Sequence, residues 1–263
     1  MKAIKIRPLI SEETEKIPSL IQSGIRADIY PLTIYSSEKY KFFVDDTMKQ
    51  AKTKFIGAFH KDTLLGFAEW RLNDVEIFLN NIYIKGSHRG LGIGTQLLEY
   101  GLSQFRTPTT RYFSLDVFDN NQNAKLWYER IGMEKQHVTY WHIAKQRRLE
   151  TNNGLVLASV SNLKDADEQH TKYGFSMLQI STENGNYEIG RITNDYYRIH
   201  QSEALSDEQL RLKLNEMNPY RKLLFLSKSS NVNGFKAVCT SNRMKAKLTH
   251  QLGGLNGYQT LGS

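Results

Sequence analysis

A loop with three alternating glycines is the stretch of this sequence best suited to chemistry. Gly90, Gly92 and Gly94 follow a strand-like run that ends at Ile84, and a helix-like run begins at Thr95. The first backbone N–H groups of a helix have no intrahelical partners and lie at the positive end of the helix dipole, so they bind phosphate oxygens. Glycine allows close approach and positive φ. The loop therefore fits a phosphate site, although three glycines also suit a plain tight turn.

Two other phosphate loops do not fit this spacing. The dinucleotide pattern Gly-x-Gly-x-x-Gly fails because Thr95 or Leu97 stands where the third glycine is needed. The nucleoside triphosphate loop fails because no Gly-Lys-Ser or Gly-Lys-Thr follows. What remains is Arg-x-x-Gly-x-Gly, which is read at Arg89, Gly92 and Gly94 between a strand and a helix. This pattern resembles the acetyl-CoA loop of the GNAT superfamily of N-acetyltransferases.

A second segment downstream of the loop strengthens this resemblance. The superfamily's next strand and helix have the spacing seen here for Val117, Asn121, Ala124, Tyr128 and the pair Gly132-Met133. Met133 replaces a more usual Phe, which is a conservative change in a packing role. The two motifs stand in the superfamily's order, and the resemblance covers residues 1–148.

The resemblance implies where acetyl-CoA binds. In the superfamily the pantetheine arm lies between two parallel strands that splay apart, here 75–84 and 111–118. It pairs with the backbone of the first strand, a role that falls to Ile82, Tyr83 and Ile84. The pyrophosphate is expected on the backbone N–H groups of Arg89, Gly90, Leu91, Gly92, Ile93, Gly94 and Thr95. Asn121 is expected to hydrogen-bond the pantetheine arm, and a plain helix N-cap is compatible with that role.

Tyr128 is the residue to which the resemblance assigns general-acid catalysis. The leaving thiol has a pKa near 8.5 by analogy with cysteine, whereas a phenol with a pKa of about 10 stays protonated at neutral pH and can donate its proton. Tyr128 also belongs to the cofactor-binding set. Without the resemblance, an aromatic ring packed under the sheet is the simpler interpretation.

The general base is not singled out by the sequence. A primary amine with a pKa of about 10.4 is almost fully protonated at pH 7, so a carboxylate or a water relay would assist. Glu76 opens the first splayed strand, and Glu69 lies on the neighbouring strand. An exposed surface carboxylate is the competing interpretation for both. His88 is expected to be a solvated turn residue.

A mixed sheet is needed to position these residues. Apolar residues at helical spacing predict helices at 17–25, 38–52, 95–105 and 121–131. Alternation of period two and buried apolar runs predict strands at 54–59, 64–72, 75–84, 111–118 and 136–144. The order predicts an α/β fold with helices on the faces of a mixed sheet, as in the superfamily. Five aromatic residues fall where the superfamily lines its acceptor site, and most are expected in the core: Tyr30, Tyr35, Tyr40, Phe42 and Phe43.

The second half is expected to hold a smaller, degenerate GNAT-like repeat. Its predicted strands lie at 155–160, 175–180, 187–192, 223–226 and 235–248, and Ser206 with Gln209 predicts a capping box at a helix start. No glycine lies between Asp195 and Ser206, so this half lacks the cofactor loop and is expected to bind no acyl-CoA. We predict domains at 1–148 and 155–250, a linker at 150–154 and a flexible tail at 251–263.

Composition excludes several other classes of protein. The 263 residues are 40% hydrophobic and 24% charged, which suffices to bury a core. The single cysteine, Cys239, excludes an internal disulfide and a multi-cysteine metal site. With no signal-like N-terminus or long apolar run, the chain is expected to be cytoplasmic and to have no membrane partner. The formal charge of +8 is not clustered, so no nucleic-acid partner is expected.

Together these features predict an N-acetyltransferase that moves an acetyl group from acetyl-CoA to a primary amine by direct attack in a ternary complex, without a metal. The acceptor is left open between a small molecule and a peptide or protein amine, and a homodimer is left open too. The competing interpretation is a non-catalytic acyl-CoA-binding or regulatory module, in which no amine reaches the cofactor.

Overall fold

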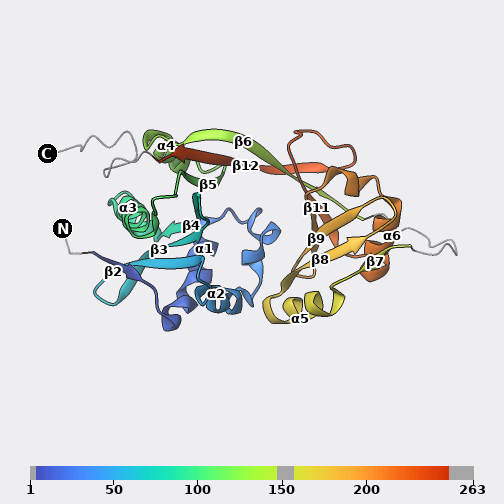
Figure 1. Ribbon diagram of the computed structural model, residues 1–263, viewed down its shortest axis with the longest axis horizontal. Coiled ribbons are helices and arrows are strands. Elements are labelled where there is room, and N and C mark those ends of the chain that lie inside the picture. Colours follow the sequence, from blue (N-terminus) through green and yellow to red (C-terminus); the bar gives the residue numbers. More distant parts are fainter. Residues whose placement is uncertain (1–3, 147–156, 249–263) are drawn as a thin grey trace. The chain divides into compact units, whose positions relative to one another are not determined.

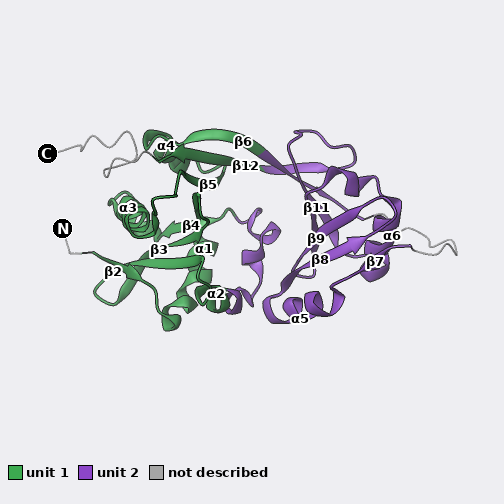
Figure 2. Ribbon diagram, viewed as in Figure 1, with its two compact units in different colours: residues 1–26, 44–138, 240–263 green, residues 27–43, 139–239 purple. Residues whose placement is uncertain are grey.

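The computed structural model describes residues 4–146 and 157–248 (Figure 1), and the chain divides into two units. Unit 1 comprises residues 1–26, 44–138 and 240–263, and unit 2 comprises residues 27–43 and 139–239 (Figure 2). The linker expected at 150–154 and the tail expected at 251–263 lie outside the described residues. No helix within the described ranges is long and apolar enough to cross a membrane.

Unit 1 has the predicted succession of strands and helices. Its elements are β1 (Lys5–Pro8), α1 (Ile17–Gly24), α2 (Tyr40–Met48, which begins in unit 2), β2 (Thr53–His60), β3 (Thr63–Leu72), β4 (Glu76–Ile84), α3 (Ile93–Phe105), β5 (Tyr112–Phe118), α4 (Gln122–Arg130) and the first part of β6 (Glu134–Ala144). Strands β1 to β4 are antiparallel neighbours in chain order, and β5 runs parallel to β4. The α/β fold with a mixed sheet is therefore confirmed.

Strand β1 and the start of helix α3 differ from the sequence analysis. Strand β1 was not predicted, because four residues carry too little alternation to reveal a strand. Helix α3 begins at Ile93 rather than Thr95, because Gly92 adopts a left-handed conformation with φ of 73° and forms its N-cap. Two of the three loop glycines therefore lie before the helix, and Gly94 lies inside its first turn.

The core of unit 1 lies between the sheet and helices α3 and α4. Trp70 of β3 is fully buried there, with Phe105 and Phe113 packed against its ring. Gly101 of α3 lies directly over this ring, and a Cβ at that position would collide with the indole. Glycine thus lets α3 approach the sheet closely at the centre of the core.

Unit 2 repeats the order of unit 1. Its elements are β7 (Ser159–Val160), α5 (Leu163–Tyr173), β8 (Phe175–Ser181), β9 (Asn186–Ile192), β10 (Tyr196–Ile199), α6 (Glu208–Met217), β11 (Lys222–Ser227) and the first part of β12 (Lys236–Lys247). Strands β8, β9 and β10 are antiparallel, α6 follows, and β11 runs parallel to β10. This is the order of β2, β3, β4, α3 and β5, so a second GNAT-like domain is confirmed.

Four elements of unit 2 were predicted incorrectly or missed. The capping box at Ser206 is wrong, because α6 begins at Glu208 and the Asp207 carboxylate accepts from the Leu210 N–H at 3.0 Å. Helix α5 was not predicted, since Ala166 is its only fully buried side chain and the apolar stripe is weak. The strand expected at 155–160 is described only at 159–160, and β10 was not predicted because it has four residues.

Strands β6 and β12 each contribute to both units. In unit 1, β12 pairs antiparallel with β5 from Ser241↔Phe118 to Lys247↔Tyr112. In unit 2, β6 pairs antiparallel with β11 from Leu223↔Ala144 to Ser227↔Tyr140. The sheet of unit 1 is therefore completed by a strand from the far end of the chain. The units do not coincide with the ranges 1–148 and 155–250, which stay a prediction about how the sequence divides.

Candidate functional site

Strands β4 and β5 separate partway along their length. They pair in parallel from Glu76↔Tyr112 to Leu79↔Leu115, although β4 continues to Ile84. Beyond Leu79, the edge of β4 that faces β5 has no strand partner among the described residues. Backbone N–H and C=O groups at such an edge can pair with an extended ligand. The splay expected from the sequence is thus present between these two strands.

A β-bulge lies at the point of separation. On the β3 side, Glu69 pairs with Asn81 and Trp70 pairs with Leu79, so Asn80 is the extra residue. A bulge bends its strand and increases its twist, which explains why β4 turns away from β5 here. The three residues expected to pair with pantetheine follow this bulge: Ile82, Tyr83 and Ile84.

The glycine loop after β4 presents a run of free backbone donors. Gly90 and Gly92 have φ of 76° and 73°, a region that disfavours residues with a Cβ. None of the backbone N–H groups from Gly90 to Thr95 donates a hydrogen bond to a described residue. Consecutive N–H groups at a left-handed residue and a helix start form an anion-binding concavity. The phosphate interpretation gains support over a plain turn.

Arg89 and Gly94 have different roles in this loop. The backbone N–H of Arg89 donates to the Gly86 carbonyl at 3.3 Å, and its Nε donates to the Ile84 carbonyl at 3.0 Å. Arg89 therefore ties the loop back to β4 instead of offering a free backbone donor. A Cβ at Gly94 would lie 3.5 Å from the Trp127 ring of α4, which is ordinary contact. The start of α3 thus lies against α4.

Tyr128 lies in the core beside the splay. Its side chain is 4% exposed and shares a buried cluster with Leu79 and Leu115, the last paired residues of β4 and β5. Its ring centroid is 4.9 Å from that of Trp127. Burial raises the pKa of the Tyr128 phenol, because the phenolate would lose its hydration. The hydroxyl therefore stays protonated and able to donate over the whole neutral and mildly alkaline range.

Asn121 caps helix α4. Its side-chain oxygen accepts from the Ala124 N–H at 3.3 Å, so the helix-cap interpretation is confirmed. This bond satisfies one of the free N–H groups at the helix start. The contact of Asn121 with a pantetheine arm stays a prediction.

The two candidate bases differ in environment. Glu69 is 1% exposed and accepts from Asn81 Nδ2 at 2.5 Å, with the Arg71 guanidinium at 3.5 Å, so the exposed-surface alternative is wrong for it. Glu76 is half-buried and forms an ion pair with Lys245 at 3.3 Å. Glu69 is paired across from Asn81, directly after the bulge, whereas Glu76 precedes Asn81 by about 17 Å of strand.

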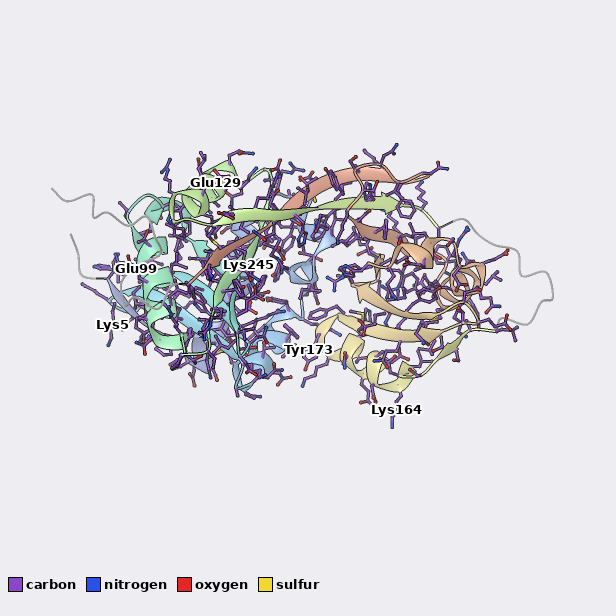
Figure 3. All side chains as sticks on the ribbon, turned by 45° about the horizontal axis from the view of Figure 1, so that its top comes forward. Lys5, Glu99, Glu129, Lys164, Tyr173 and Lys245 are labelled. Carbon is purple, nitrogen blue, oxygen red and sulfur yellow. The ribbon has the colours of Figure 1, made fainter. Side chains whose placement is uncertain are left out.

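Strand β12, which comes from the far end of the chain, supplies charged residues that contact β5 and the start of β4. Arg243 binds Asp116 of β5 through two hydrogen bonds of 2.6 and 2.9 Å, and this pairing raises the pKa of Arg243. Lys245, labelled in Figure 3, lies 3.9 Å from the Tyr112 ring centroid. These residues were missed because no local signal places residues 241–247 beside β5.

The aromatic residues of the segment 27–43 belong to unit 2. Tyr40 is 1% exposed, and Phe43 lies 5.0 and 5.5 Å from the rings of Phe175 and Tyr173 (centroid distances). Tyr30 and Tyr35 are half-buried, whereas Phe42 is 51% exposed and is not a core residue. Most of the five are therefore at least partly buried.

Two further features bear on the chemistry. His88 ends the short turn Gly86–His88, where its Nδ1 lies 2.8 Å from the Ser87 hydroxyl oxygen, and it is half-buried. Residues 4–146 and 157–248 contain no group of three or more His, Cys, Asp or Glu side chains arranged to hold a metal ion.

Comparison with known proteins agrees with this geometry. Residues 23–133 match the acetyltransferase (GNAT) family, whereas no curated protein matches the sequence. A tandem GNAT protein from the clavulanic acid biosynthesis pathway is similar in structure, with a TM-score of 0.64 and 13% identity over 93% of this chain and 98% of that chain. A GCN5-related N-acetyltransferase from Sphaerobacter thermophilus has a TM-score of 0.62 and 11% identity over 93% and 95%. At these identities the likeness shows a shared fold with two GNAT-like units.

Proposed function

We propose that the protein, whose residues 23–133 belong to the acetyltransferase (GNAT) family, transfers the acetyl group of acetyl-CoA to a primary amine. The observation that carries this proposal is the run of free N–H groups from Gly90 to Thr95, directly after the unpaired edge of β4. The run suits a pyrophosphate, and the edge suits an extended amide-containing arm. Acetyl-CoA offers both groups in one molecule.

The transfer would proceed in a ternary complex. The amine nitrogen attacks the thioester carbonyl carbon, the new C–N bond forms, and the C–S bond breaks as the tetrahedral intermediate collapses. Tyr128, next to the splay, donates its hydroxyl proton to the departing thiolate. A base accepts the proton released by the amine. Ile82, Tyr83 and Ile84 hold the pantetheine arm, and Asn121 adds a polar contact.

Glu69 fits the role of base better than Glu76. It is buried directly after the bulge, where the thioester would lie, and its hydrogen bond from Asn81 fixes the carboxylate. Glu76 lies nearer the start of β4 and is already paired with Lys245. We therefore assign proton acceptance to Glu69, directly or through water, and a structural ion pair to Glu76.

Thiol release distinguishes an enzyme from a non-catalytic acyl-CoA-binding module. We expect free CoA thiol to appear when acetyl-CoA is mixed with the protein and a suitable amine, followed with a chromogenic thiol reagent across a panel of amino acids, polyamines, amino sugars and peptides. The matched alcohols serve as controls, because they lack the attacking nitrogen. Calorimetric binding of acetyl-CoA without amine-dependent release across the panel would favour the binding module.

Valine at Gly92 or Gly94 is expected to weaken CoA binding at least about tenfold. The new side chain would hold the pyrophosphate away from the N–H groups, and at Gly92 the positive φ adds strain. Calorimetry measures the dissociation constant, and a stoichiometry of one CoA per chain is expected because unit 2 lacks the loop. Gly86→Val is the matched control, since a Cβ there meets nothing within 4 Å and lies outside the run. Unchanged affinity in folded variants of both glycines would remove the loop from the site.

A further inference from the structure

Unit 2 contains a guanidinium without a counter-ion. Arg198 lies on β10, and its side chain makes no hydrogen bond or ion pair with any described residue. Its Nε is fully shielded from solvent and has no acceptor. Burial lowers the pKa of Arg198, which reflects the cost of holding this charge away from water.

Two other arginines of unit 2, both buried, have partners for most of their side-chain nitrogens. Arg191 donates to the Ser176 hydroxyl and forms an ion pair with Asp167, each at 2.7 Å. Arg221 donates to the carbonyls of Thr193 and Tyr196 at 2.6 and 3.3 Å. Buried charges in proteins are almost always paired or hydrogen-bonded, because an isolated one is strongly destabilising. Arg198, which is half-buried, has no such partner among the described residues of unit 2.

The Arg198 side chain occupies the space over Gly190. Gly190 is its partner across the β9–β10 pair, and a Cβ at position 190 would lie 3.2 Å from Arg198 Cβ and 3.3 Å from Nε. The side chain therefore lies over Gly190, against the sheet. Two rings interact electrostatically with it: the interaction with Tyr35 acts to raise the pKa of Arg198, and burial, with a smaller contribution from Arg198, lowers the pKa of His200. His200 is exposed, so one side is open to solvent.

We infer that Arg198 anchors an anion-binding site in unit 2, which takes a carboxylate or phosphate group of a small ligand against the guanidinium, beside Tyr35 and His200. The planar guanidinium offers two parallel N–H donors to either group. The exposed His200 lets the ligand enter from solvent and adds a donor when protonated. This site consists of side chains in unit 2, whereas the loop from Gly90 to Thr95 offers backbone donors in unit 1.

The test uses the full chain with a saturating concentration of CoA, so that the glycine loop is occupied. The midpoint of thermal unfolding is measured against inorganic phosphate and, separately, against succinate, with chloride holding the ionic strength constant. A ligand at 100 times its dissociation constant is expected to raise the midpoint of the wild-type protein by about 5 °C. A response to one anion alone identifies the group that the site takes, and a response to both identifies a general oxyanion site.

Variants test whether the rise in the unfolding midpoint depends on Arg198. Arg198→Met is expected to abolish the shift and to be at least as stable as the wild type in chloride alone, because an apolar side chain replaces an unpaired charge. Gly190→Ala keeps the charge but places a Cβ 3.2 Å from Arg198 Cβ, which displaces the arginine side chain, and it is expected to weaken anion binding at least about tenfold. Arg211→Met, on α6, is the control and should respond as the wild type does. A full shift in Arg198→Met, or no shift in the wild type with either anion, overturns the proposal.

Discussion

Replacing Tyr128 by Phe is expected to lower kcat by about 10² to 10⁴-fold, the usual contribution of a general acid, while leaving the dissociation constant of acetyl-CoA nearly unchanged. The hydroxyl is proposed to protonate the thiolate in the transition state, whereas the ring that packs beside Leu79 and Leu115 is retained. Steady-state kinetics and calorimetry on the same preparations measure the two quantities.

The pH dependence and a control sharpen this prediction. Because burial raises the pKa of Tyr128, its proton is retained as the pH rises past the ordinary value of about 10, so kcat/KM should increase until the amine is deprotonated and show no loss from the phenol. Tyr100→Phe on α3 is the matched control and should keep full activity. A loss of less than about tenfold in Tyr128→Phe would mean that water or another donor protonates the thiolate, and the assignment would be withdrawn.

The parts of the site that depend on neighbouring residues were predictable from the sequence. The glycine loop, the helix after it and the cap at Asn121 arise within a few residues of each other, where propensity and spacing act directly. The parallel splayed strands were implied by the resemblance to the superfamily, and the structure has them in β4 and β5. The spacing of residues did not predict the environment of individual side chains. The burial of Glu69 is an example, because it depends on the bulge at Asn80 and the contact with Asn81.

The parts that depend on distant pairing were not predictable. Residues 235–248 read as a strand, yet nothing local indicates that residues 241–247 pair with β5, more than 120 residues earlier. The aromatic segment 27–43 was expected beside the acceptor of the first domain, but it packs on β8 of unit 2. In both cases the local pattern predicts the element, whereas tertiary packing determines which other element it contacts. Arg198 was overlooked for the same reason, since only the fold reveals that it has no counter-ion.

Truncating Met244 to Ala is expected to lower the free energy of unfolding of unit 1 by about 2–5 kcal/mol, the usual cost of removing a buried Met side chain. Met244 is 1% exposed, lies opposite Leu115 of β5 and belongs to the same core cluster as Tyr128. A loss of stability of this size would show that β12 is part of the core beside which β4 and β5 separate. Urea unfolding followed by tryptophan fluorescence measures it, since Trp70 and Trp127 both report on this core.

Lys247→Ala on the same strand is the control for this prediction, because Lys247 is exposed and its removal should change the stability by no more than about 0.5 kcal/mol. Since β5 forms one wall of the proposed cofactor cleft and β12 is its neighbour, Met244→Ala should also weaken acetyl-CoA binding, whereas Lys247→Ala should not. Equal stabilities for the two variants would show that β12 does not complete unit 1 in solution. The wall of the cleft would then have to be held by β4, α3 and α4 alone, and the C-terminal strand would be dispensable for the chemistry.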